Sequence, residues 1–130
     1  MMNEKYKINR IIYIFVLFAI LGLIGIHIMN NYVDNLSKEY SIDIRSVSKI
    51  NATIVKIVPW HGITYVELSN GNKYMINHSR NYAYSNPFFG DNIIIGDSII
   101  KKANSDSLWV KSLKGEFIFI VGECINKPKE

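Results

Sequence analysis

The longest apolar stretch of the chain is residues 11–29, nineteen positions without a charge. A helix of that length rises about 28 Å, close to the ~30 Å hydrocarbon core of a bilayer. Lipid offers no hydrogen bonds to exposed backbone groups, so a helix is the conformation that such a segment must adopt. Tyr13 and His27 stand near its ends, where polar tips reach the headgroups. We therefore predict one transmembrane helix at 11–29, in contact with membrane lipid.

From residue 49 onward the apolar positions form short runs rich in β-branched residues, which is typical of strands. Asn70-Gly71 is the strongest hairpin signal, because both turn positions must tolerate positive φ. Pro59 is expected to end the first strand and to open a turn that closes at Gly62. The predicted strands are 53–58, 63–68, 73–76, 98–102, 108–113 and 117–121.

Six short strands joined mostly by tight turns predict an antiparallel meander, and closure into a barrel would remove its exposed edges. We expect a mainly β fold: an N-terminal single transmembrane helix followed by a small six-stranded antiparallel barrel-like domain, SH3-like or OB-like. Tyr32, Leu36 and Tyr40 are four apart, so the helix should continue a turn or two beyond the membrane. The predicted divisions are a basic N-terminus (1–10), the helix (11–29), a stalk (30–48), the barrel-like domain (49–125) and a polar tail (126–130).

Charges beside the apolar stretch predict its orientation. Lys5, Lys7 and Arg10 precede it, whereas only Lys38 stands in the fifteen residues that follow. The positive-inside rule therefore puts the N-terminus in the cytoplasm and the C-terminal domain in the periplasm, with the chain crossing the inner membrane once. A cleaved signal peptide is the rival interpretation, but the stretch is longer than the usual apolar core and no A-x-A pattern follows it.

The net charge of +4 does not indicate nucleic-acid binding. From residue 30 onward the chain has 12 basic and 10 acidic residues, and the basic ones are scattered. Binding to nucleic acid needs a concentrated basic face that displaces counterions from phosphates. The abundance of Ile, Asn and Lys is typical of AT-rich bacterial genomes.

Residues that could carry catalysis do not form a recognisable motif. His61 and His78 have no metal-ligand spacing with the nearby carboxylates, Glu67, Asp91 and Asp97. Gly96-Asp97-Ser98 is typical of a turn at the start of a strand, and the single cysteine, Cys124, has no activating neighbour. We predict no enzyme activity, no cofactor and no metal. A hydrolase that uses His61 or His78 with a carboxylate is a further hypothesis, ranked after the two binding functions given below.

The candidate binding surface consists of two aromatic segments. Residues 77–92 are long for a loop in a small domain, and such loops are often functional. Its aromatic side chains either plug an open end of the barrel or form a binding lip. Together with the predicted turn near residue 60, the candidate partner or ligand residues are Trp60, His61, Tyr82, Tyr84, Phe88 and Phe89.

One late segment resembles a known group of proteins. Gly96-Asp-Ser-Ile-Ile-Lys, followed by Asn104-Ser-Asp-Ser-Leu-Trp-Val, is similar to the G-D-S-[IV]-x-K hairpin of short, uncharacterised bacterial envelope proteins with an N-terminal membrane helix and a small β domain. The resemblance implies this layout and no particular activity.

These observations together predict a membrane-tethered, non-catalytic interaction or assembly module of the bacterial cell envelope, with an envelope protein as partner. The alternative is an extracytoplasmic binding module for a glycan or peptidoglycan fragment, because small barrels often bind ligands on an aromatic open face. The sequence leaves the oligomeric state open.

Overall fold

The computed structural model describes residues 4–129. The outermost parts of the predicted N-terminal segment and polar tail, residues 1–3 and 130, lie outside the described residues. The chain divides between Lys38 and Glu39 into two units, which are described separately.

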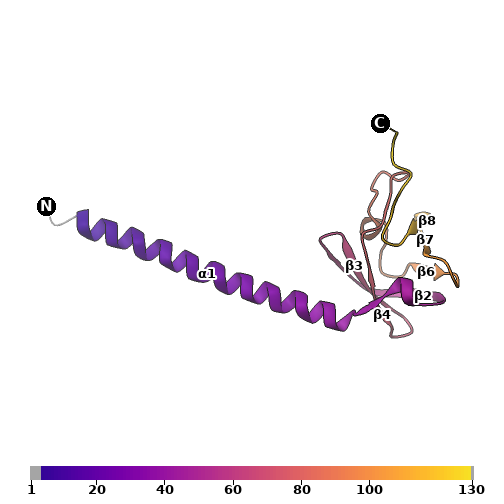
Figure 1. Ribbon diagram of the computed structural model, residues 1–130, viewed down its shortest axis with the longest axis horizontal. Helices are drawn as coiled ribbons and strands as arrows, with labels where there is room; N and C mark the ends of the chain where they lie inside the picture. Colours follow the sequence, from indigo (N-terminus) through magenta and orange to yellow (C-terminus); the bar gives the residue numbers. More distant parts are fainter. Residues whose placement is uncertain (1–3, 130) are drawn as a thin grey trace. The chain divides into compact units, whose positions relative to one another are not determined.

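The first unit consists of helix α1 (Glu4–Glu39), which runs without a break (Figure 1). It contains the whole predicted segment 11–29, whose side chains are exposed. Among the described residues it is the one helix long and apolar enough to cross a membrane. The helix extends ten residues past position 29, about 15 Å of further rise.

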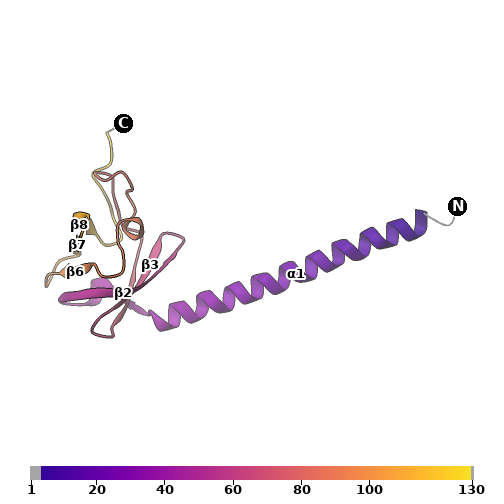
Figure 2. The same ribbon diagram turned by 180° about the vertical axis from the view of Figure 1, so that it is seen from behind.

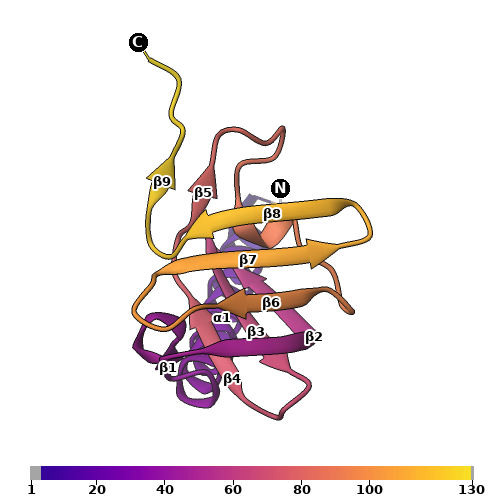
Figure 3. The ribbon, with the colours of Figure 1, turned by 90° about the vertical axis from the view of Figure 1, so that its right-hand side faces the viewer.

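The second unit is a mostly antiparallel sheet domain with two short 3-10 helices, η1 (Ile44–Ser46) and η2 (Phe89–Asp91). Figure 2, seen from behind, and Figure 3, seen from one side, show β2, β6, β7 and β8 one after another in that order. In the described residues the main sheet has seven strands in the order β1-β4-β3-β2-β6-β7-β8, and β5 and β9 form a separate parallel pair. The strands are β1 (Ile42–Asp43), β2 (Ile50–Trp60), β3 (Ile63–Leu68), β4 (Lys73–Ile76), β5 (Arg80–Asn81), β6 (Ser98–Lys101), β7 (Ser107–Ser112), β8 (Gly115–Ile120) and β9 (Cys124–Ile125).

The predicted closure into a barrel is wrong. The six predicted strands correspond to β2, β3, β4, β6, β7 and β8, but β1 and β8 are the edges of the sheet in the described part of the chain and do not pair with each other. The sheet bends instead at β2, whose residues 50–53 pair with β6 and whose residues 54–60 pair with β3. A bulge between Ile54 and Lys56 marks the change of partner, and bulges increase local bending.

The first predicted strand is longer than expected, because Pro59 lies inside β2 and pairs with Thr64. Trp60 and Ile63 flank the turn and form a hydrogen-bonded pair, so the next pair, Pro59 and Thr64, needs no hydrogen bond from residue 59. The other side of β2 is unpaired at this point, since β6 reaches only Thr53. The missing N–H of Pro59 therefore costs no ladder hydrogen bond.

Both early hairpin turns differ from expectation. The β2–β3 turn is His61-Gly62, with φ of +45° and +83°, which is the pattern of a two-residue type I′ turn. At the β3–β4 turn only Gly71 of the Asn70-Gly71 pair has positive φ, +81°. The Gly71 N–H donates to the Leu68 carbonyl at 2.8 Å, and the Leu68 N–H donates to the Asn72 carbonyl at 2.9 Å. The loop is therefore one residue longer than the predicted two-residue turn.

The segment 77–92 covers the exposed edge strand β8. Asn81 Nδ2 donates to the carbonyl of Ile118 at 2.9 Å, and the Ile118 N–H donates to Tyr84 Oη at 2.9 Å. Two side chains thus occupy edge positions that another strand would otherwise fill. Phe89, 2% exposed, packs from the same segment against Phe119 at 5.2 Å between ring centroids.

Most of the buried apolar side chains of the sheet domain form one cluster inside the bent sheet, and Tyr40 and Tyr65 are buried outside it. Burial of this cluster is the main favourable term for folding of the domain. Its members are Ile44, Ile50, Ile54, Val66, Leu68, Tyr74, Ile76, Phe89, Ile93, Ile99, Leu108, Val110, Phe119 and Val121.

An ion pair to β4 and a hydrogen bond from the residue after it hold the start of the second unit in place. Glu39 pairs with Lys73, and this hydrogen bond lowers the pKa of the Glu39 carboxyl. Asp43 accepts from the Arg45 side chain at 2.7 Å, which lowers the pKa of its carboxyl, and it also accepts from Asn77 Nδ2 at 3.2 Å. The second half of the predicted stalk therefore belongs to the sheet domain, as β1 and η1.

Candidate functional site

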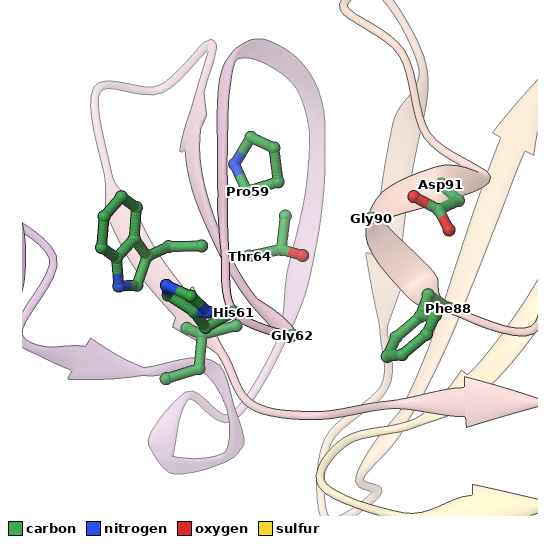
Figure 4. Close-up of a pocket in the computed structure, with 9 residues that line it drawn as sticks. Pro59, His61, Gly62, Thr64, Phe88, Gly90 and Asp91 are labelled. Atoms are coloured by element: carbon green, nitrogen blue, oxygen red, sulfur yellow. The ribbon is translucent and has the colours of Figure 1, made fainter.

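The candidate site is a pocket of about 280 Å³ between the tip of the β2–β3 hairpin and the turn that contains η2. In Figure 4, Pro59 and Thr64 on the hairpin face the turn that carries Phe88, Gly90 and Asp91. The pocket residues are Pro59, Trp60, His61, Gly62, Ile63, Thr64, Phe88, Gly90 and Asp91.

The hairpin side of the pocket is fixed by strand register. Pro59 and Thr64 are cross-strand partners, so their side chains stand on the same face of the hairpin. Trp60 and Ile63 form the next pair and stand on the opposite face. His61 lies at the tip with its ring 4.8 Å from that of Trp60, and the His78 ring lies directly against Gly62.

The opposite wall is formed by Phe88, the residue that precedes η2. The Arg80 guanidinium lies over the Phe88 ring, 4.0 Å from its centroid, which fixes the position of the ring. The turn is tied down by Asn92, whose Nδ2 donates to the carbonyls of Asn86 and Phe88 at 2.7 Å each.

The structure brings together three of the six residues predicted from the sequence, Trp60, His61 and Phe88, at this one pocket. The other three lie elsewhere. Phe89 is in the core, and Tyr84 packs on Phe117 at 5.1 Å between centroids while accepting from the Ile118 N–H. Tyr82 is 36% exposed, and its Oη accepts from Arg80 Nη1 at 3.2 Å.

Sequence reasoning missed Thr64, Gly90 and Pro59. Nothing in the local pattern distinguishes Thr64 from other strand threonines, and its role depends on the partner that the fold places opposite it. Gly90 lies so close to Thr64 that a Cβ added there would stand 2.8 Å from Thr64 Oγ1. Asp91 was considered only as a metal ligand or as the carboxylate of an acid–base pair with a histidine.

His61 and Asp91, two of the groups that suggested catalysis, both line the pocket. Within residues 4–129, neither His61 nor His78 makes a hydrogen bond to a carboxylate, and no three metal-ligating side chains come together. Asp97, 3% exposed, accepts from the Ile94 N–H at 2.9 Å through its side chain, which is the turn role expected for it. Cys124 is exposed and free.

Comparison with known proteins gives no relative: no family model, no curated protein and no solved structure matches this chain.

Proposed function

We propose that the chain is a membrane-tethered, non-catalytic binding module of the bacterial cell envelope, which holds a component of the envelope in the pocket beside Thr64 and Phe88. Helix α1 anchors it in the inner membrane with the N-terminus in the cytoplasm, and the sheet domain acts in the periplasm.

The tether is supported by α1 and its flanks. The segment 11–29 has the length and composition of a membrane span, and the basic residues Lys5, Lys7 and Arg10 precede it. The helix continues past the span before the sheet domain begins at Glu39. A domain tethered to a membrane meets envelope components at high effective concentration, so modest affinity for them suffices for function.

The observation that carries the proposal is the pocket itself. It is concave, it has apolar walls from Pro59 and Phe88, and it presents a small number of polar groups, which are the features of binding sites in general. Its volume of about 280 Å³ is near the lower end for small-molecule sites, roughly 300–1,000 Å³, so it suits a single ring or side chain of a larger partner.

The architecture supports an incompletely closed relative of the SH3-like and OB-like barrels. One long strand, β2, is shared by two curved halves, and the segment 77–92 covers the gap that pairing would close in a full barrel.

The test is photo-crosslinking in native membranes, with p-benzoylphenylalanine in place of Phe88 in the full chain. The aromatic replacement preserves the contact with Arg80 and places the reactive carbonyl at the pocket. We expect a discrete adduct with one envelope component, protein or glycan.

The matched control carries the same residue in place of Trp109, a half-exposed aromatic on β7 outside the pocket. Adducts from position 88 that position 109 does not form support the proposal. Identical adducts from both positions, or adducts with lipid alone, contradict it.

A further inference from the structure

The pocket presents a threonine hydroxyl that no other group of the described residues binds. Thr64 is 4% exposed, and among the described residues its side chain makes no hydrogen bond. Its Oγ1 is not among the fully enclosed, unsatisfied side-chain atoms, so the hydroxyl opens onto the pocket. Figure 4 shows it directed from the hairpin toward Gly90. Because the hydroxyl is open to the pocket and unused within the described protein, it is available to donate to a ligand and to accept from it.

Gly90 keeps that hydroxyl uncovered. Any side chain at this position would begin 2.8 Å from Thr64 Oγ1 and would fill the floor of the pocket. Gly90 does not need positive φ, so the close approach to Thr64 is the physical reason for a glycine here.

The charges around the pocket favour a neutral ligand. Asp91 is exposed on the rim and forms no ion pair within the described residues. The Arg80 guanidinium lies against the Phe88 ring, so one cation and one anion flank the pocket. A ligand without net charge needs no further counter-charge at a site flanked by one charge of each sign.

We infer that the pocket is a subsite for one neutral sugar residue of an envelope glycan, an inference that rests on the proposed function. A sugar ring presents C–H faces that suit Phe88 and Pro59, and hydroxyls that donate to Asp91 and exchange hydrogen bonds with Thr64. The small volume accepts one ring, and the rest of the glycan continues along the surface.

The test is saturation-transfer NMR on the full chain in lipid nanodiscs, because sugar-based detergents would compete. The probes are chitotriose, maltotriose and cellotriose. We expect saturation transfer to one ring of at least one trisaccharide. Thr64→Val, which keeps the shape of the side chain, weakens that binding about three- to tenfold while thermal unfolding is unchanged or shifts upward. Asp91→Asn weakens it at least tenfold, because a hydrogen bond to a charged acceptor is lost.

Matched controls are Thr53→Val, a strand threonine outside the pocket, and Asp106→Asn, an exposed carboxylate outside it. Both should bind as the wild type does. Equal binding by Thr64→Val and the wild type overturns the inference, and so does the absence of transfer to all three sugars from a folded protein.

The crosslinking experiment distinguishes failure of the sugar inference from failure of the proposed binding function. No sugar binding together with a discrete protein adduct from position 88 means that a protein side chain fills the pocket, so the sugar inference fails and the proposed function stands. No sugar binding and no discrete adduct rejects both.

Discussion

Phe89→Ala is expected to destabilise the sheet domain by about 3–5 kcal/mol, the usual cost of deleting a buried phenyl ring. Phe89 is 2% exposed and packs edge-on against Phe119, so the substitution leaves a cavity at the centre of the core. Small domains are stable by only about 5–15 kcal/mol, so this loss takes a large part of the total. Urea unfolding of the full chain in micelles, followed by near-UV circular dichroism, measures it.

The neighbouring residue provides the control. Phe88 is half-buried on the pocket wall, and Phe88→Ala should cost no more than about 1.5 kcal/mol while abolishing the sugar contact at the pocket. The two adjacent phenylalanines thus separate stability from binding. Equal destabilisation by both substitutions would contradict the assignment of Phe89 to the core and Phe88 to the site.

Leu17→Arg combined with Leu21→Arg is expected to abolish membrane integration. Each exchange of Leu for Arg near the middle of a span costs about 3–4 kcal/mol of insertion free energy, so the pair costs about 6–8 kcal/mol. Both residues are exposed on α1, so neither supports a packed core that could explain the loss. Sedimentation after alkaline carbonate washing should find the wild type in the membrane pellet and the variant outside it.

Asn31→Arg combined with Ser37→Arg adds the same charges to α1 beyond the predicted span. This control should remain in the pellet. Release of the wild type by carbonate, or retention of the Leu17→Arg, Leu21→Arg chain, would show that α1 does not anchor the protein.

The elements with strong local signals were predictable from the sequence. The strands at 63–68 and 73–76 match β3 and β4, because their β-branched and aromatic residues are bounded by glycine-containing turns. The helix followed from nineteen residues without a charge. Local composition decides both cases.

Closure and register were not predictable, because they depend on partners distant in the chain. Nothing near residue 59 reveals that β2 is unpaired on one side there, and this is what lets Pro59 remain in the strand. Similarly, Asn81 and Tyr84 look like ordinary loop residues until the fold places the edge of β8 beside them.

The candidate site was half predictable for the same reason. Aromatic residues signalled Phe88 and the hairpin tip, since large rings in loops are conspicuous in any sequence. The Thr64 hydroxyl gave no signal, because its place in the pocket exists only after β3 and η2 have come together. Tyr84 and Phe89 share the loop with Phe88 but pack inward, and loop composition does not reveal which rings do so.

The proposed function requires that the sheet domain lies outside the cytoplasm. The natural cysteine of the chain allows this location to be measured by thiol labelling. Cys124 is the single cysteine of the sequence and is exposed on the sheet domain. A membrane-impermeant maleimide should label it in spheroplasts with an intact inner membrane. A chain with Cys124→Ser and Lys7→Cys should be labelled only after lysis. Protection of Cys124 until lysis would place the domain in the cytoplasm and contradict the account.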